Sequence, residues 1–532
     1  MKVSDCIIHC LENEGVEYVF GIVGKETLDL AESLAKSKQI QFVNVRHEQG
    51  AAFMADVYGR LSKKAGVCLS TLGPGATNLL TGISSSKLDH SPLVALIGQA
   101  SMERHHPESH QYLDIVKLCE PATKWSTQLT DSLNVPAMIR KAFREAKMEK
   151  PGSVAVVIPE NFLTQKISNK PLSVNPLPEN VPVLETLKSA ITLIESHMKP
   201  FILVGNGVIR QDAAIELQTF INTLQAPVTH SFMAKGILDK AHPANYFTFG
   251  FNENDLVLTG MQEADLLIAI GVDFVEQLPQ HWNYKKIPVL HIDSLPAEMN
   301  EYYPVAIECV GNIQKTLQLL NQMGSPAKPW IPYSNLKEKI MSAYQINDGQ
   351  QTKTSSTPFT IEDILHCIED FTTENTIVIS DVGAHKVSIA RTYQPKKPNR
   401  LIISNGLASM GIAIPGSIGA KLACPKDPVI CITGDGGALM NFAEIETAKR
   451  LGLSFVIIVI NDSMLKLEVQ QMTKLFGESY GVRFQNPDFV QLAASFGIKG
   501  MRVGNMNEFE TILIETLHTL DEIVLIEVAM QN

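Results

Sequence analysis

Two polar clusters in the last third of the chain have the composition of a metal and diphosphate site. Residues 429–432 form an apolar run that ends in Thr433-Gly434-Asp435-Gly436-Gly437, and residues 455–460 form another that ends in Asn461-Asp462-Ser463. Asp435 and Asn461 offer hard oxygen ligands of the kind Mg²⁺ uses when it bridges a protein to phosphates. The small glycines Gly434, Gly436 and Gly437 let backbone amides approach a diphosphate at the start of a helix.

The position of both clusters strengthens this interpretation. A lone Gly-Asp-Gly is most often a tight turn, because glycine and aspartate both favour turns. Here each cluster directly follows a predicted strand, with a helix-length stretch between them. In open parallel sheets, ligands bind at the carboxyl ends of the strands, so the two clusters are predicted to meet there.

Other candidate residues also follow predicted strands. Glu48 comes after a strand at residues 42–45 and starts a helix with an apolar face, where it could also be a simple N-terminal helix charge. Residues 70–78 form a glycine turn, which alone would be only a strand-to-helix connection. His385 follows a strand at residues 377–380 and could equally be a surface histidine. Met410 lies among small residues in 404–415, and methionine in a helix is usually plain core.

Together these segments resemble the thiamine-diphosphate-dependent enzymes, and within them the acetolactate synthase group. The resemblance implies that Asp435, Asn461 and the Ser463 carbonyl ligate Mg²⁺. It also implies that Gly434, Gly436, Gly437 and His385 contact the diphosphate of the cofactor. Thiamine diphosphate must lose a proton from a very poorly acidic carbon. Glu48 matches the glutamate that bonds to the pyrimidine ring and favours the imino tautomer, whose nitrogen is the internal base.

The same resemblance gives roles to further residues. Gly73 and Asn78 border the pyrimidine and the substrate, and Gln111 lies near the reacting centre. Met410 matches a large apolar side chain that wedges between the two rings of the cofactor. The carbonyl of Ala408 is the candidate acceptor from the cofactor's amino group.

The central third of the chain carries an incomplete dinucleotide pattern. Gly205-Asn206-Gly207 follows a predicted strand, but Arg210 stands where the fingerprint requires glycine, so the match is weak. Residues 271–276 replace the segment that carries an arginine in FAD-binding acetolactate synthases. The chain therefore resembles the FAD-free catabolic type, and FAD is expected to be absent.

The resemblance implies that pyruvate is decarboxylated and its remaining two carbons are joined to a second 2-keto acid, giving 2-acetolactate. The chain departs from the group at Val23, Glu26, Lys466 and Glu468, positions that face substrate. Another thiamine-diphosphate decarboxylase, oxidase or carboligase is therefore the first alternative. An NAD-linked oxidoreductase rests only on the pattern at Gly205. A catalytically silent regulatory subunit is disfavoured by the retained Glu48, Asp435 and Asn461.

Apolar, β-branched runs alternate with helix-length segments along the whole chain, which is typical of α/β proteins with parallel sheets. Two stretches interrupt the alternation, 166–183 and 323–358, and are predicted to be linkers. We therefore expect three doubly wound domains: a pyrimidine-binding domain at 1–165, a central Rossmann-like domain at 184–325 and a diphosphate-binding domain at 358–532. Ten strands are predicted: 67–70, 93–97, 154–158, 201–204, 266–270, 289–292, 377–380, 429–432, 455–460 and 523–528.

Composition limits the partners. The 532 residues carry a formal charge of -11 without a basic stripe, which disfavours nucleic acid and anionic membranes as partners. No signal-peptide core or membrane-length apolar run is present, so a soluble, cytoplasmic protein is expected. The eight scattered cysteines, without a CxxC pair, indicate reduced and packed thiols. The expected ligand is a small 2-keto acid, and the resemblance implies a homodimer or homotetramer with active sites between subunits.

Overall fold

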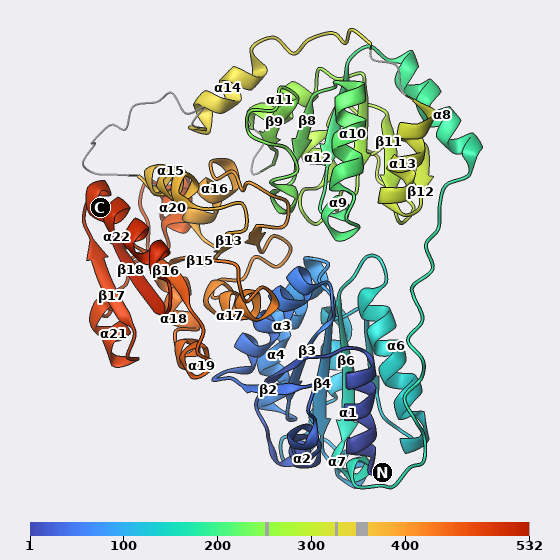
Figure 1. The fold of residues 1–532 in the computed structure, drawn as a ribbon, viewed down its shortest axis with the longest axis vertical. Coiled ribbons are helices and arrows are strands. Elements are labelled where there is room, and N and C mark those ends of the chain that lie inside the picture. Colours follow the sequence, from blue (N-terminus) through green and yellow to red (C-terminus); the bar gives the residue numbers. More distant parts are fainter. Residues whose placement is uncertain (251–254, 325–327, 347–359, 531–532) are drawn as a thin grey trace.

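Three parallel β-sheets, each flanked by helices, build the molecule. The computed structural model describes residues 1–250, 255–324, 328–346 and 360–530. Within these ranges each sheet has six strands, and the three bodies follow one another along the chain (Figure 1). The predicted α/β class with three parallel sheets is confirmed.

The first sheet has the strand order β2-β1-β3-β4-β6-β5. Helices α1, α2, α6 and α7 pack on one face and α3, α4 and α5 on the other, so its inner strands are buried on both sides and are almost purely apolar. The strands are β1 (Tyr18–Gly21), β2 (Gln41–Asn44), β3 (Gly66–Ser70), β4 (Leu93–Gln99), β5 (Trp125–Gln128) and β6 (Ser153–Pro159). The helices are α1 (Val3–Asn13), α2 (Leu28–Lys36), α3 (Glu48–Ser62), α4 (Pro74–Leu88), α5 (Ile115–Cys119), α6 (Val135–Lys147) and α7 (Glu160–Leu163).

The central sheet has the order β12-β11-β10-β7-β8-β9. Its strands are β7 (Pro200–Val204), β8 (Val228–His230), β9 (Asn245–Thr248), β10 (Leu266–Ile270), β11 (Val289–Asp293) and β12 (Val305–Val310). One face packs against α8 (Leu184–Ser196), α9 (Gly207–Arg210), α10 (Ala214–Leu224) and α13 (Ile313–Met323). The other packs against α11 (Leu256–Met261), α12 (Pro279–Trp282) and α14 (Leu336–Ala343).

The third sheet has the order β14-β13-β15-β16-β18-β17. Its strands are β13 (Ile377–Ser380), β14 (Leu401–Ile403), β15 (Val429–Gly434), β16 (Phe455–Asn461), β17 (Lys499–Val503) and β18 (Ile523–Ala529). One face carries α15 (Ile361–Phe371), α16 (Ala384–Arg391) and α22 (Met506–His518). The other carries α17 (Ala413–Ala423), α18 (Asp435–Met440), α19 (Glu444–Arg450) and α21 (Phe489–Ser495).

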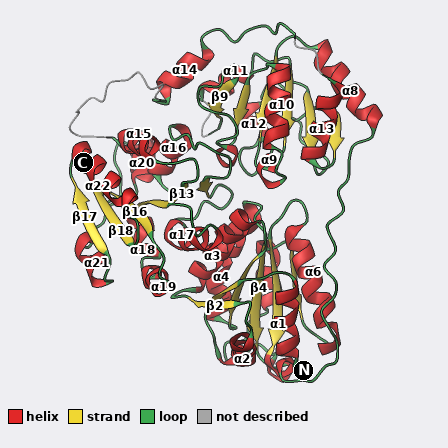
Figure 2. Ribbon diagram, viewed as in Figure 1, coloured by secondary structure: helices red, strands yellow, loops and turns green. Residues whose placement is uncertain are grey.

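The first and third sheets share one hydrophobic core. Buried side chains of α3 and α17 belong to the same apolar cluster, which reaches both sheets. Figure 2 shows these two helices between the two yellow sheets. The turns that precede α3 and follow β15 are therefore held by a common packed layer.

All ten predicted strands are confirmed, and the strand expected at 42–45 corresponds to β2. The strands without a prediction are mostly edge strands, such as β5, β9, β12, β14 and β17. An edge strand has a neighbour on one side only and is less apolar, which weakens its sequence signal. The predicted linker at 323–358 contains α14, which packs on the central sheet. Residues 325–327 and 347–359, which include the expected third-domain start at 358, lie outside the described residues.

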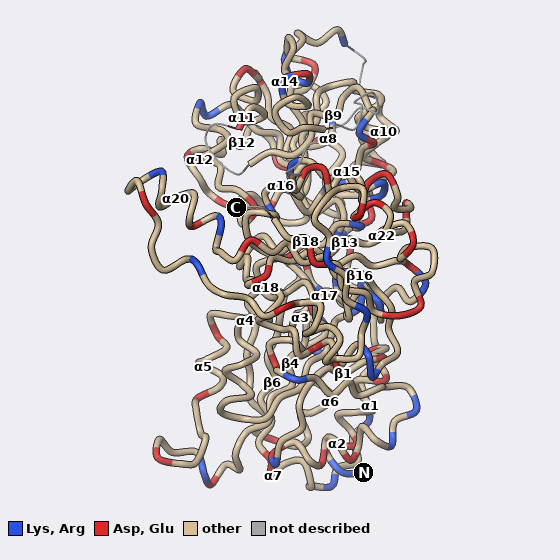
Figure 3. Tube along the Cα trace, turned by 90° about the vertical axis from the view of Figure 1, so that its left-hand side faces the viewer, with Lys and Arg blue, Asp and Glu red and all other residues tan. Residues whose placement is uncertain are grey.

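The distribution of charged residues along the fold and the burial of the cysteines agree with the expectations from the sequence. Figure 3 shows acidic and basic residues interspersed over all three bodies. The eight cysteines are free thiols, and all but Cys424 are buried. In the described part of the chain, no helix combines the length and the apolarity that a membrane crossing needs.

Candidate active site

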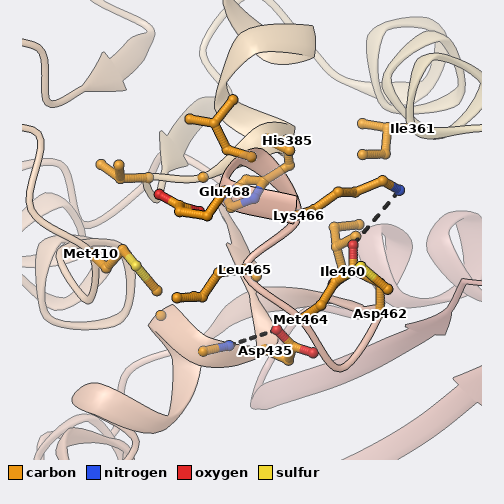
Figure 4. Close-up of a pocket in the computed structure, with 17 residues that line it drawn as sticks. Ile361, His385, Met410, Asp435, Ile460, Asp462, Met464, Leu465, Lys466 and Glu468 are labelled. Carbon is orange, nitrogen blue, oxygen red and sulfur yellow. Dashed lines mark hydrogen bonds and ion pairs between the residues drawn. The ribbon is translucent and has the colours of Figure 1, made fainter. Parts of the chain in front are cut away.

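A pocket lies at the carboxyl ends of β15 and β16. It encloses about 590 Å³, including space open to solvent, and is formed entirely by the third body (Figure 4). β15 and β16 are adjacent in the sheet, so their ends bring the two predicted polar clusters together. The lining residues are Ile361, Val382, Gly383, Ala384, His385, Met410, Gly434, Asp435, Gly436, Gly437, Ile460, Asp462, Met464, Leu465, Lys466, Leu467 and Glu468.

Asp435 connects the turns that follow these two strands. Its side chain is buried, although a carboxylate is stable inside a protein only when it is well hydrogen-bonded. Oδ1 accepts a bond from Gly436 N at 2.7 Å, and Oδ2 accepts one from Ser463 N at 2.7 Å. The aspartate therefore fixes the position of Ser463 relative to the glycine turn.

Asn486, which the sequence did not identify, completes this group. Its Nδ2 donates to Asp435 Oδ2 at 2.7 Å and to Asn461 Oδ1 at 2.8 Å. Asn461 Nδ2 donates to Glu527 Oε1 at 2.7 Å, which keeps its Oδ1 turned toward Asp435. Asn486 Nδ2 thus bridges Asp435 and Asn461 and holds their oxygens close to each other. The pair Asn486-Pro487 looks like an ordinary turn in sequence, so no local signal could have found it.

The predicted ligand Ser463 has a backbone suited to its role. Its φ of 57° lies in the left-handed region, and its carbonyl accepts a bond from Phe484 N at 3.1 Å. A carbonyl oxygen has two lone pairs, so one acceptor site remains. Among the described residues no group of three or more His, Cys, Asp or Glu side chains could hold a metal. The candidate set instead combines a carboxylate, an amide oxygen and a carbonyl, which suits Mg²⁺.

His385 lines the same pocket in a neutral form. Burial lowers the pKa of His385 to about 4. Its Nε2 is buried and has no hydrogen-bond partner in the protein. A neutral imidazole has one N–H and one bare nitrogen, so the free Nε2 donates to an oxygen of a bound ligand in the tautomer that carries the proton on Nε2.

Met410 and Ala408 lie in a loop held by Asp381. Met410 lines the pocket opposite Gly436, and a Cβ placed on Gly436 would lie 3.1 Å from Met410 Cε. Ala408, with a φ of 52°, does not line the pocket. The fully buried Asp381 accepts from Gly411 N at 2.8 Å and from Thr433 Oγ1 at 3.0 Å, which ties the Met410 loop to the end of β15. Asp381 follows a strand that ends in an unremarkable turn, so the sequence carries no signal for its role.

The candidate residues of the first body form a second group. Glu48 is the first residue of α3 and is buried, and its Oε2 accepts from Asn78 Nδ2 at 2.9 Å. A side chain on Gly73 would begin 2.9 Å from the carbonyl oxygen of Gln111, so these two turns are in contact. Gln111 is exposed.

The pocket takes no lining residue from the group around Glu48. The residues that line the pocket run from Ile361 to Glu468, and none comes from the described part of the first body. The structure therefore brings His385, Met410 and the Asp435 cluster together, and separately gathers Glu48, Asn78, Gly73 and Gln111.

Comparison with known proteins identifies the family. Residues 1–118 match the thiamine pyrophosphate enzyme N-terminal TPP binding domain. Residues 187–320 match the central domain of these enzymes, and residues 381–528 match the C-terminal TPP binding domain. The chain belongs to the thiamine pyrophosphate enzymes. In this thiamine pyrophosphate enzyme, the Glu48 group falls in the N-terminal TPP binding domain and the pocket around Asp435 in the C-terminal one.

Similar proteins extend over nearly the whole chain. The acetolactate synthase of Bacillus subtilis (strain 168) is 30% identical, and the match covers 98% of this chain and 92% of that protein. A probable acetolactate synthase large subunit of Methanococcus aeolicus is 32% identical over 100% of this chain and 92% of its own. The acetolactate synthase isozyme 3 large subunit of Escherichia coli (strain K12) is 30% identical over 99% and 95%.

Proposed function

We propose that this thiamine pyrophosphate enzyme is an acetolactate synthase. It decarboxylates pyruvate and joins the remaining two carbons to a second 2-keto acid, giving 2-acetolactate. The observation that carries this proposal is the full-length similarity to proteins named acetolactate synthase in bacteria and in Methanococcus aeolicus. The two groups of polar residues, one in each TPP binding domain, support the same activity.

Mg²⁺ is the proposed metal, held by Asp435, Asn461 and the carbonyl of Ser463. The donation from Asn486 Nδ2 to both Asp435 and Asn461 supports the site, because it indicates that these oxygens already converge on one point. Gly434, Gly436 and Gly437 offer close backbone approach for the diphosphate. With its proton on Nε2, the neutral His385 is a further donor toward it, because that nitrogen has no partner in the protein.

When bound, thiamine diphosphate supplies the carbon nucleophile and the electron sink that decarboxylation of a 2-keto acid requires. Glu48 holds a proton at the pyrimidine nitrogen, and Asn78 keeps its carboxylate oriented. Met410 would contact the bound cofactor between its rings, and the Ala408 carbonyl would accept a hydrogen bond from its amino group. Gly73 and Gln111 border the reacting centre. The apolar side chains of Ile460, Met464 and Leu465 limit water in the pocket.

The separation of the two groups supports an assembly in which Glu48 of one subunit meets the Asp435 pocket of another. Such a homodimer, or a homotetramer made of two of them, would have two equivalent sites per pair. We also propose the domain bounds 1–165, 184–325 and 358–532, and a cytoplasmic location.

We expect the protein to bind no FAD. Asp273 stands in the segment that carries an arginine in FAD-binding relatives of this group. Its buried carboxylate pairs with Arg210 at 2.6 Å and with Lys150 at 2.9 Å, so charges of the protein itself neutralise one another there. A purified protein with a stoichiometric flavin spectrum would overturn this expectation.

Product analysis tests the proposed function. Purified protein is incubated with thiamine diphosphate, Mg²⁺ and a panel of 2-keto acids, and acetolactate, acetaldehyde and peroxide are assayed separately. We expect 2-acetolactate from pyruvate and no turnover without thiamine diphosphate. Turnover without that cofactor would instead support an NAD-linked oxidoreductase.

A second function in the same cofactor class is favoured by two pocket residues. Lys466 and Glu468 place charges where the group is usually apolar, and both line the pocket. Lys466 lies 3.7 Å from Asp462, which leaves Glu468 as an acidic group facing the cavity. Acetaldehyde or peroxide as the main product would establish a decarboxylase or an oxidase.

A further inference from the structure

A buried carboxylate of the third body reaches into the first body at the turn before Glu48. Glu444 begins α19 and is 1% exposed. Its Oε1 accepts bonds from Arg46 N and His47 N, both at 3.0 Å. Its Oε2 accepts from Thr447 Oγ1 at 2.7 Å. Charged acceptors form the stronger hydrogen bonds in proteins, so this contact holds the turn firmly.

The turn that Glu444 holds determines where α3 begins, and Glu48 is the first residue of that helix. Arg46 and His47 connect β2 to α3, and His47 is the residue that caps α3 directly before Glu48. The carboxylate comes so close that a Cβ on Gly50 would lie 2.6 Å from Glu444 Oε1. A larger residue at position 50 would clash with the Glu444 carboxylate, so glycine is needed there for this approach.

The carboxylate of Glu48 accepts a hydrogen bond from Asn78. Glu444 therefore holds the backbone that leads into Glu48, while Asn78 holds the Glu48 carboxylate. We propose that Glu444 is a positioning residue for Glu48, holding the catalytic carboxylate of the first body from the third body. This inference rests on the proposed role of Glu48, and its first test is independent of that role.

Amide hydrogen exchange in the cofactor-free protein measures the contact directly. In Glu444→Ala the amides of Arg46 and His47 lose their acceptor, and their exchange should accelerate by about tenfold or more, as expected for bonds to a charged group. Glu444→Gln should keep slow exchange, because its amide oxygen can accept both bonds and its NH₂ can face Thr447 Oγ1. The matched control is Lys449→Ala on the same helix. Lys449 is exposed and its Nζ donates to the carbonyls of Phe496 and Gly497 in the third body, so its loss should leave both amides slow.

Kinetics then test positioning. Because small displacements of a catalytic group are costly, we expect kcat of Glu444→Ala to fall about 10²-fold. The affinity for thiamine diphosphate with Mg²⁺ should stay near that of wild type, since the Asp435 cluster is untouched. Glu444→Gln should restore most of kcat. If Glu444→Ala does not fold, Glu444→Asp serves instead, because it keeps the charge but withdraws the carboxylate by one methylene.

Three outcomes would overturn the inference: unchanged exchange at Arg46 and His47 in Glu444→Ala, a Glu444→Gln variant as impaired as Glu444→Ala, or equal losses in cofactor affinity and kcat. Failure of the proposed function looks different. In that case wild type makes no 2-acetolactate, while the exchange rates still decide whether Glu444 holds the turn.

Discussion

At the scale of single residues, the site is marked by buried polar atoms whose partners are incomplete. His385 Nε2 and Asn486 Oδ1 are both buried without a hydrogen bond in the protein. Native proteins rarely leave such atoms unpaired, because an unsatisfied buried polar group costs about 1–3 kcal/mol. His385 lines the Asp435 pocket and Asn486 bonds directly to Asp435, which supports the assignment of this region as the ligand site.

Glu48 should be required for activation of the cofactor but not for its binding. In Glu48→Gln, an amide of the same shape replaces the carboxylate, and it cannot hold the proton that the pyrimidine nitrogen must receive. We expect exchange of the reactive proton of thiamine diphosphate to fall to background while cofactor affinity stays near that of wild type. NMR of the quenched cofactor measures the exchange. Near-normal turnover of Glu48→Gln would remove the assignment.

Asn486 should tune the metal site without ligating the metal. Residues that orient metal ligands typically contribute about 10–100-fold to metal affinity. Asn486→Ala releases Asp435 Oδ2 and Asn461 Oδ1, so Mg²⁺ and thiamine diphosphate should both bind more weakly by a factor in that range. Calorimetric titration checks this. The control is Asn505→Ala, which removes an asparagine that caps α22 away from the pocket. Wild-type affinity in Asn486→Ala would show that the contact is incidental.

The neutral state of His385 predicts a specific pH effect. Its folded pKa of about 4 lies below the ordinary 6.5, so between these values the unfolded chain binds a proton that the folded protein does not. Stability is therefore lost as pH falls from about 6.5 toward 4, and His385→Asn removes this loss. The free energies of unfolding of the cofactor-free proteins, measured by denaturant titration at pH 7, 6 and 5, should diverge by up to about 1.4 kcal/mol per pH unit in favour of the variant. Burial raises the pKa of Asp56 to about 6, so Asp56 stabilises the folded protein as pH falls. This contribution is the same in wild type and variant and cancels from the difference between them. Parallel pH profiles would contradict the prediction.

At the scale of elements, the sequence predicts the buried strands and the clusters at their ends, because each depends on residues that are neighbours in the chain. The apolar runs of β15 and β16 and the polar residues that follow them are local signals. The roles of Asn486 and Glu444 have no such local signal, since each side chain bonds to a segment distant in sequence. Asn486 reaches residues 51 and 25 positions away within the third body. The Glu444 contact joins the third body to the first, whose packing through α3 and α17 no local pattern encodes.

One interelement contact can be tested through Gly406. Asp89 Oδ1, at the end of α4, accepts from Asn405 N at 3.0 Å and from Gly406 N at 2.6 Å. A Cβ on Gly406 would lie 2.4 Å from Leu88 Cβ and 2.8 Å from its carbonyl oxygen. Gly406→Ala should push the segment that leads to Met410 away from α4 and cost about 1–3 kcal/mol of stability.

Thermal unfolding and cofactor titration measure this effect. Cofactor affinity should fall together with stability in Gly406→Ala, because Ala408 and Met410 follow the displaced segment. Gly504→Ala is the matched control, since the nearest atom to its Cβ, Glu508 Oε2, is 4.0 Å away. Equal melting temperatures for Gly406→Ala and wild type would show that the segment accommodates the methyl group.

At the scale of the whole molecule, the first and third bodies share a core, yet the pocket of the third body takes no residue from the first. The Glu444 contact joins the two bodies at the turn before Glu48, and Glu444 does not line the Asp435 pocket. α20 (Lys466–Phe476), which contributes Lys466 and Glu468 to the pocket, has no buried residue and projects from the body in Figure 3. Each of these features is consistent with a pocket that a second subunit completes.

Mixing two inactive variants tests the shared site. If each site combines Glu48 of one subunit with Asp435 of the other, a dimer of one Glu48→Gln chain and one Asp435→Ala chain has one site with both lesions and one intact site. An equal mixture after subunit exchange should recover about a quarter of wild-type activity, because half of the dimers are mixed and each has one good site of two. Were the sites built within single chains, every site would keep a lesion. No recovery, with mixed dimers demonstrated by differently tagged chains, would refute the shared site.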